Sequence, residues 1–277
     1  MNDSNSFSPR FRQSRVRARW LAGEPALCTV VQLSDPSIVE LVSGLGYDCI
    51  WLDLEHSPMS AETASNLMRA ARQGDTDILA RPGKGEFMRM GRLLEAGANG
   101  ILYPRCESVE EAREVVRWAK FAPIGERGFS GSNADADYGS PDVAEYLAAA
   151  NRETFICVQI ESPSALPHAR AIAAVDGVDA LFFGPGDFSV LTGHPGQPDH
   201  PSVFTACQEV CAAARSAGKR FATVTFSQEH AQRLLDMGAT FLHHGVDIRI
   251  LRDAYVGMRD NLGKMGFKFG RTRVPTA

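Results

Sequence analysis

An apolar run in the first quarter of this chain ends in two carboxylates and an imidazole. Residues 50–52 are apolar without a helical period, which predicts a buried strand, and Asp53, Glu55 and His56 follow directly. Such polar groups are costly at the end of a buried strand unless that end opens onto water or a polar site. A histidine beside carboxylates is a frequent general-base arrangement, because the acid orients the ring. The motif alone fits equally well a strand end in which Asp53 caps the next helix and His56 is merely solvated.

Other strand-like runs end in polar residues of the same kinds. Arg81 closes the run 77–81, Glu161 closes a second run, and Asp187 follows a third. Gln159 stands two residues before Glu161, so both side chains face the same side of their strand. Two carboxylates without a histidine or cysteine cluster favour a hard divalent cation such as magnesium or manganese. Alternatively, Glu161 forms an ion pair with Arg81, and Asp187 caps a short helix.

Two further features are suited to an anionic substrate. A buried guanidinium needs an anionic partner, and that of Arg81 suits a carboxylate or a developing enolate oxygen. The turn Gly184-Pro185-Gly186 leads into a short helix that begins near Asp187. The free backbone N–H groups of this helix would receive a substrate carboxylate.

From residue 26 onward, short β-branched segments alternate with longer amphipathic ones. Strands are predicted at 27–31, 48–53, 77–81, 100–104, 154–161, 180–184, 220–225 and 241–246. Helices are predicted at 36–45, 61–72, 87–96, 109–119, 164–174, 203–217, 228–237 and 248–262. Eight such units in about 250 residues predict an α/β fold, a (β/α)8 TIM barrel with extra terminal helices. Catalytic groups of this barrel lie at the C-terminal ends of its strands, which is where the polar residues fall.

We expect one barrel domain between two terminal segments. Residues 1–24 are expected to form an arginine-rich arm, with a helix near 12–22 that packs on the domain or on a neighbouring subunit. The barrel domain is expected at 25–265. A C-terminal tail is expected at 266–277, with a disordered end. An irregular stretch at 123–141 is longer than most connections, which is typical of a functional or mobile loop.

Composition excludes some function classes. The net charge of the 277 residues is −4, which gives no general electrostatic case for binding nucleic acid or a membrane. No apolar run approaches the ~20 residues of a membrane span. The six cysteines have no paired spacing, which predicts reduced thiols in a cytoplasmic protein. The arginine- and serine-rich start leaves organellar targeting open.

Six short motifs together resemble the HpcH/HpaI aldolase family, the metal-dependent (class II) pyruvate aldolases that act on 4-hydroxy-2-oxo acids. They occur in family order and span about residues 25–265. The resemblance implies an enzyme that reversibly cleaves a 4-hydroxy-2-oxo acid into pyruvate and an aldehyde through a metal-stabilised pyruvate enolate. The motifs are Asp53-x-Glu55-His56-x-Pro58, Arg81-Pro82, Glu95-Ala96-Gly97-Ala98, Pro123-x-Gly125-Glu126-Arg127-Gly128, Val158-Gln159-Ile160-Glu161-Ser162 and Gly184-Pro185-x-Asp187.

The resemblance also assigns a pyruvate site. Glu161 and Asp187 would bind the divalent ion, which would be magnesium, manganese or cobalt. Arg81 would steady the keto or enolate oxygen of pyruvate, and Gln159 would lie beside it. The ion and Arg81 would thus act on the same developing negative charge.

Proton transfer would fall to His56. The resemblance pairs this ring with an acid at the position of Glu95, and Asp53 is the alternative residue to orient it. His56, acting directly or through a water molecule, would remove the proton of the 4-hydroxyl group in cleavage and return it in condensation. Some members of the family have Asp where this chain has Glu95.

The chain departs from the family pattern in its eighth strand, where His243 and His244 replace the usual apolar residues. Successive strand residues face opposite sides, so we expect one ring inside the barrel and the other towards the helices. Phe188, Phe226 and the loop at 129–138 are candidates for an unusual aldehyde pocket.

A homo-oligomer is expected, because the segment ending near Trp20 and the last helix carry more apolar residues than eight barrel units require. The resemblance implies a hexamer of three dimers that exchange terminal helices. The loop at 128–140 would then lie over a neighbouring active site as a lid. Arg127 would contact the distal end of the substrate, or form a structural ion pair, which is an equally good interpretation.

Three other functions stay open at this point. A Schiff-base aldolase needs a lysine of depressed pKa at the barrel mouth, and Lys84 follows a C-terminal strand end. A carbon–carbon lyase acting on a CoA thioester would use a related barrel. A non-catalytic barrel would bind a metal and a keto acid without turnover.

Overall fold

Eight parallel strands close into a barrel in the computed structural model, which describes residues 12–139 and 142–271. Each strand pairs with the next, and β8 pairs with β1, so the predicted (β/α)8 barrel is confirmed. The strands are β1 (Ala26–Val31), β2 (Cys49–Asp53), β3 (Asp77–Arg81), β4 (Gly100–Tyr103), β5 (Phe155–Ile160), β6 (Ala180–Phe183), β7 (Arg220–Thr225) and β8 (Phe241–Val246).

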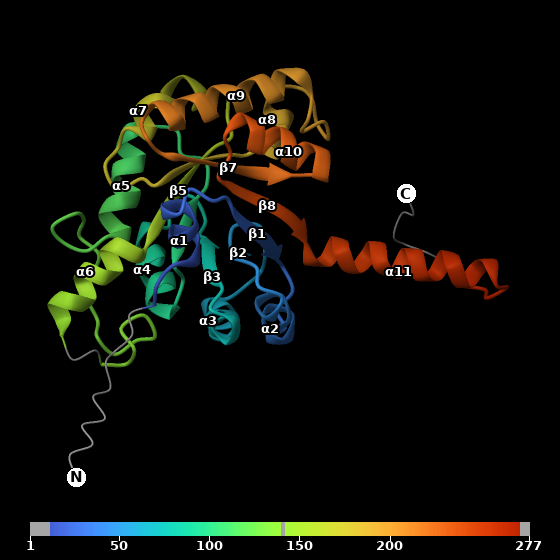
Figure 1. Cartoon of the computed structure of the whole chain (residues 1–277), viewed down its shortest axis with the longest axis horizontal. Coiled ribbons are helices and arrows are strands. Elements are labelled where there is room, and N and C mark those ends of the chain that lie inside the picture. The colour runs from blue at the N-terminus through green and yellow to red at the C-terminus, as the bar shows by residue number, and fades with distance from the viewer. Residues whose placement is uncertain (1–11, 140–141, 272–277) are drawn as a thin grey trace, which may run out of the picture.

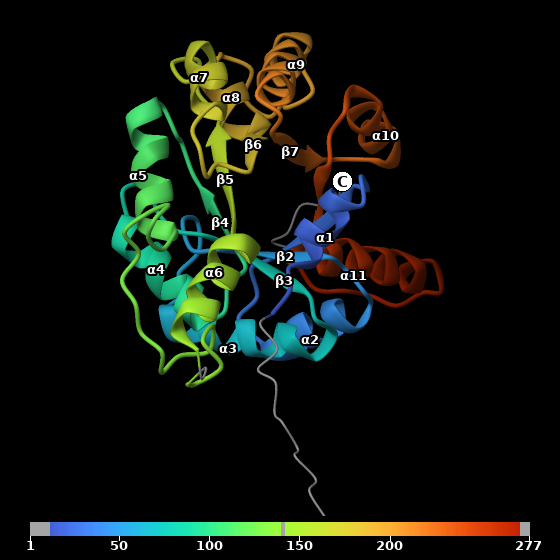
Figure 2. The ribbon, with the colours of Figure 1, turned by 60° about the vertical axis from the view of Figure 1, so that its left-hand side comes forward.

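Helices surround the barrel (Figures 1 and 2). The helices are α1 (Arg15–Leu21), α2 (Pro36–Gly44), α3 (Ala61–Ala71), α4 (Phe87–Ala96), α5 (Val109–Ala119), α6 (Val143–Glu153), α7 (Ala169–Ala173), α8 (Pro185–Leu191), α9 (Pro201–Ser216), α10 (Gln228–Met237) and α11 (Asp247–Lys264). The sequence analysis did not predict α6, whose N-cap Asp142 accepts a hydrogen bond from the Glu145 amide. None of the helices within the described ranges is long and apolar enough to cross a bilayer.

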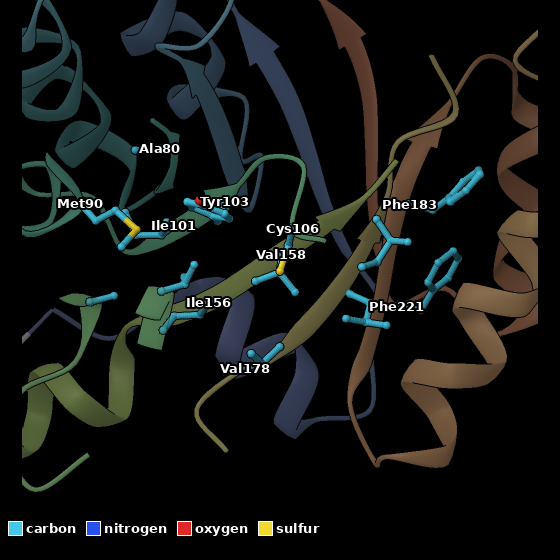
Figure 3. Close-up of a cluster of buried hydrophobic side chains, with 14 of the residues drawn as sticks. Ala80, Met90, Ile101, Tyr103, Cys106, Ile156, Val158, Val178, Phe183 and Phe221 are labelled. Atoms are coloured by element: carbon cyan, nitrogen blue, oxygen red, sulfur yellow. The ribbon is translucent and has the colours of Figure 1, made fainter. Parts of the chain in front are cut away.

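Alternating strand residues build two cores. In β2, Ile50 and Leu52 point outward and join the large cluster between the strands and the helices, part of which Figure 3 shows. Cys49 and Trp51 join the smaller cluster inside the barrel. Because side chains alternate along a strand, Asp53 faces the interior like Trp51, at the C-terminal end of β2.

Helix α1 closes the N-terminal end of the barrel of its own chain. The Trp20 ring packs edge-on against the rings of Phe155 and Phe241, at 5.6 and 5.7 Å between centroids. The Ser14 hydroxyl and the Val16 amide donate hydrogen bonds to Asp77, at 2.6 and 2.9 Å. The barrel thus buries the apolar face of α1, which confirms the predicted packing of this helix on its own domain and removes this face as an argument for a neighbouring subunit.

The long connection after α5 also lies at the N-terminal end of the barrel. The Arg127 guanidinium forms an ion pair with Asp135 at 2.9 Å, and the Asp135 amide donates to the carbonyl of Glu95 at the end of α4. Active-site residues of a TIM barrel lie at the opposite end, so this connection cannot cover the site of its own chain. Residues 140–141 and 272–277 of the predicted loop and tail lie outside the described ranges.

Helix α11 leaves the barrel and projects away from it (Figure 1). Contacts with β1 and β8 hold its start. Large apolar side chains along it are exposed, and their exposed fractions reach 66% at Tyr255 and 51% at Met258. An exposed apolar surface of this kind is typical of a contact with another protein surface.

Candidate active site

A bidentate ion pair stands at the C-terminal ends of β2 and β3. Asp53 and Arg81 are in register, and Arg81 donates from Nε to Oδ1 at 2.9 Å and from Nη2 to Oδ2 at 2.7 Å. Both residues are buried. Asp53 Oδ1 also accepts the backbone N–H groups of Glu55 and His56, at 3.1 and 3.3 Å. One carboxylate therefore fixes both the guanidinium and the turn that carries the histidine.

Arg81 connects this pair to β5. Its guanidinium carbon lies 4.5 Å from the centroid of the Trp51 ring, and this cation–π contact stabilises the position of the guanidinium. Arg81 Nη1 donates to Gln159 Oε1 at 3.3 Å, and Gln159 Nε2 donates to Glu161 Oε2 at 3.0 Å. The predicted residues of three strands thus form one continuous hydrogen-bonded chain.

Glu161 is a buried carboxylate without a cationic partner in direct contact. It forms no ion pair within the described ranges, so the alternative of a pair with Arg81 was wrong. Its Oε1 accepts the Arg105 amide at 2.9 Å. Burial first, and then the negative charge of Asp187, raises the pKa of Glu161 to about 7. Such a carboxylate gains free energy from a cation placed between it and Asp187.

Asp187 lies in the first turn of α8, half-buried beside Glu161. The N-cap of α8 is Gly184, and no side chain caps this helix, so the alternative role of Asp187 as a cap was wrong. Gly184 has a steric role, since a Cβ at this position would lie 2.3 Å from Glu161 Oε2. The Gly184 amide donates to the Ile160 carbonyl at 3.1 Å and is not free for a substrate.

The donor set of Glu161 and Asp187 fits a divalent cation. Both ligands are hard oxygen donors, and the pair carries excess negative charge in a buried place. No group of three His, Cys, Asp or Glu side chains in the described part of the chain is placed to hold a metal. Two protein carboxylates leave the other coordination positions to water and substrate, as magnesium usually requires.

His56 lies at the rim of the site, with 59% of its side chain exposed. Its Nε2 is 3.6 Å from Glu55 Oε2, and that oxygen is 3.2 Å from Arg81 Nη1. Burial raises the pKa of Glu55, while the charges of Arg81 and His56 act in the opposite direction. Glu55 was not among the predicted site residues, although its place between Asp53 and His56 was a usable signal.

Glu95 does not approach His56 within one chain. It stands at the end of α4, which delivers the chain to the N-terminal end of β4, whereas His56 follows the C-terminal end of β2. The two residues therefore lie at opposite ends of the barrel. A His56–Glu95 pair stays a prediction that requires a second chain, and so does a contact of Arg127 with a substrate.

The structure also gives the positions of the two histidines of β8 and of Lys84, which the sequence analysis singled out. His243 points into the barrel and is buried, whereas His244 is exposed, with Nδ1 3.2 Å from the Thr225 carbonyl oxygen. Lys84 Nζ lies between Glu107 and Glu111, at 3.4 and 3.3 Å. The alternative Schiff-base chemistry is not favoured by this geometry, because the ammonium group is engaged by two carboxylates and stands apart from the hydrogen-bonded chain of Arg81, Gln159 and Glu161.

Comparisons with known proteins agree with the geometry. Residues 28–254 match the model of the HpcH/HpaI aldolase/citrate lyase family. The chain is 34% identical to a hydroxypyruvate/pyruvate aldolase of Pseudomonas aeruginosa, over 86% of this chain and 88% of the relative. It is 31% identical to a 4-hydroxy-2-oxo-heptane-1,7-dioate aldolase of Shigella sonnei, over 91% and 95%. The crystal structure of an HpcH/HpaI aldolase from Desulfitobacterium hafniense matches with a TM-score of 0.84 at 30% identity, over 92% and 97%.

Proposed function

The chain belongs to the HpcH/HpaI aldolase/citrate lyase family, and we propose that it is a divalent-metal-dependent aldolase. It cleaves the C3–C4 bond of a 4-hydroxy-2-oxo acid to pyruvate and an aldehyde, and it forms the same bond in reverse. The observation that carries this proposal is the buried, cation-free carboxylate of Glu161 beside Asp187, joined through Gln159 to the guanidinium of Arg81.

Glu161 and Asp187 would hold the cation, which is magnesium, manganese or cobalt. When bound, it supplies Lewis acidity toward the 2-keto group of the substrate. Arg81 supplies a fixed positive charge and N–H donors for the oxyanion that develops there during bond cleavage. The buried contacts with Asp53 and Trp51 hold this guanidinium in place before the reaction, so little reorganisation is needed.

His56 moves the proton. In cleavage, its imidazole takes the proton of the 4-hydroxyl group as the C3–C4 bond breaks, and C4 becomes the aldehyde carbon. The electron pair of that bond stays on C3, which takes up a proton to give pyruvate. Glu55 is the carboxylate nearest the ring within one chain, and Asp53 orients the turn through its backbone.

We further propose a homo-oligomer in the cytoplasm. The exposed apolar side chains of α11 need a partner surface, and a second copy that exchanges this helix would supply one. The family resemblance favours a hexamer. All six cysteines are free and buried, which suits a reducing compartment.

A chelation experiment tests the proposed function. The protein is incubated with a panel of 4-hydroxy-2-oxo acids, and pyruvate is measured with a coupled dehydrogenase. Prolonged chelation should abolish pyruvate release, and added magnesium, manganese or cobalt should restore it. Full activity after complete metal removal, together with inactivation by borohydride in the presence of pyruvate, would favour Lys84 and overturn the proposal.

A further inference from the structure

A cavity of about 620 Å³ begins at the proposed catalytic residues and extends along β1, β7 and β8. Asp53, His56 and Arg81 line one end of it, and neither Glu161 nor Asp187 belongs to its lining. The proposed pyruvate site thus lies on one side of Arg81, and this cavity lies on the other. A substrate bound with its keto acid end at the carboxylate pair continues past His56 into the cavity.

His243 lies at the inner wall of this cavity, on β8. Its side chain is 1% exposed, and the Cys28 thiol stands opposite it in register on β1. Apart from this thiol, neither ring nitrogen has a hydrogen-bond partner within the described ranges. The ring packs against Trp51 and Phe182, at 5.5 and 4.9 Å between centroids. Trp51 also lines the cavity, and its Nε1 has no hydrogen-bond partner in the described part of the chain either. Buried polar groups without partners are rare, and two of them meet at one wall.

The surroundings of His243 are mainly aromatic. Aromatic rings and the Cys28 thiol adjoin it, and the guanidinium of Arg81 packs on the neighbouring Trp51 ring. A neutral imidazole has one donor and one acceptor nitrogen, and the indole adds a second donor. A hydroxyl group, which both donates and accepts, matches this set, whereas a methyl group leaves it unpaired.

We propose that this cavity binds the aldehyde half of the substrate and that His243 selects aldehydes bearing a hydroxyl group. The inference rests on the proposed aldolase function and adds the substrate class. The ring lines the cavity, and a substrate hydroxyl bound there would supply a hydrogen-bond partner to the ring. An aldehyde of equal size without that hydroxyl leaves the imidazole unpaired, so the enzyme rejects it.

The test compares two aldehydes of nearly equal size in condensation with pyruvate. Glycolaldehyde carries a hydroxyl group where propionaldehyde carries a methyl group. We expect the native enzyme to prefer glycolaldehyde in kcat/KM by roughly 10-fold or more. His243→Phe keeps an aromatic ring in the wall and should lower kcat/KM for glycolaldehyde by roughly 10- to 100-fold, so that the preference disappears. His243→Gln keeps a donor and an acceptor and should recover part of the preference.

A second readout separates this inference from the function on which it rests. Exchange of the C3 protons of pyruvate in deuterated water, followed by NMR, requires the pyruvate site and no aldehyde. If the native enzyme neither exchanges these protons nor condenses any aldehyde, the proposed function is wrong. If exchange and condensation occur but the native enzyme, His243→Phe and His243→Gln share one aldehyde preference, the assignment of His243 is wrong. Thermal unfolding of each variant shows whether the barrel has folded.

Discussion

The guanidinium of Arg81 and the carboxylate of Asp53 lie side by side at the ends of two neighbouring strands, joined by hydrogen bonds of 2.9 and 2.7 Å. The same carboxylate accepts the amides of Glu55 and His56. The proposed oxyanion donor and the proposed general base are therefore positioned by one side chain. Loss of its charge should disturb both steps of the reaction together.

Asp53→Asn should lower kcat/KM by roughly 10²- to 10³-fold, because Arg81 loses its bidentate partner and the turn at His56 loosens. It should also destabilise the fold by about 3 kcal/mol, since the buried guanidinium then keeps only its contact with Glu55 as an ion pair. Asp48→Asn is the matched control, because Asp48 is a buried carboxylate that pairs with Arg19 at the opposite end of the barrel. A stable Asp53→Asn variant with native turnover would contradict this interpretation of the pair.

Metal binding and proton transfer should separate by mutation. Glu161→Gln and Asp187→Asn should weaken binding of manganese, measured by titration calorimetry, and turnover should fall with it. His56→Ala should bind manganese as the native enzyme does, yet turn over roughly 10²- to 10⁴-fold more slowly. Near-native turnover of His56→Ala would remove this residue from the mechanism.

Two glycines of one turn offer a steric test of the cation site. A methyl group at Gly184 would meet Glu161 Oε2 at 2.3 Å, whereas one at Gly186 would meet no atom within 4 Å. Gly184→Ala should therefore displace the Glu161 carboxylate and weaken manganese binding by roughly 10-fold or more, while Gly186→Ala should bind manganese normally. Equal affinities in the two variants would show that the position of Glu161 does not govern the site.

Much of the fold and part of the candidate site could be predicted from the sequence, as particular residues show. The short apolar runs placed all eight strands, because the pattern of a strand depends on local sequence. The polar residues Arg81, Gln159 and Glu161 were predicted because they stand at the ends of such strands. The missed contact between Glu55 and His56 depends on a turn shaped by Asp53, and no periodic pattern encodes such a turn. The helix α6 was missed because the irregular stretch before it hides its start.

Burial raises the pKa of Asp77 from 3.8 to about 6, and hydrogen bonds from Ser14 and Val16 oppose this shift. Its Oδ1 has no hydrogen-bond partner in the described part of the chain and can carry the proton. Between pH 4 and 6 the folded state holds this proton while the unfolded state has lost it. The contribution of Asp77 to the free energy of unfolding is therefore present at low pH and decreases as pH rises to about 6.

Urea unfolding of the native protein and of Asp77→Asn measures this effect. The native protein should lose stability relative to the variant between pH 4 and 6, by on the order of 3 kcal/mol. The variant keeps an acceptor for Val16, so α1 should remain at the barrel end. A difference between the two proteins that stays constant over this range would contradict the raised pKa.

The last prediction concerns the assembly. His56 and Glu95 lie at opposite ends of one barrel, so a catalytic pair of these two residues requires two chains. His56→Ala and Glu95→Ala should each be nearly inactive alone. When the two variants are co-expressed, they form mixed dimers. One site of a mixed dimer is intact, because the Glu95→Ala chain supplies the barrel with His56 and the His56→Ala chain supplies Glu95. Random pairing should then restore about a quarter of native activity, because half of the dimers are mixed and each holds one intact site.

The control mixes His56→Ala with Arg81→Ala, whose lesions lie in the same barrel site, so no pairing of chains repairs both. This mixture should stay inactive. Light scattering should show an oligomer for the native chain and a smaller species for the pair of substitutions Tyr255→Asp and Met258→Asp, which place charges on the exposed apolar face of α11. Leu45→Asp, at the exposed C-cap of α2, should leave the size unchanged. A native monomer with full activity, or a His56→Ala and Glu95→Ala mixture no more active than its components, would show that Glu95 does not serve the histidine of another chain.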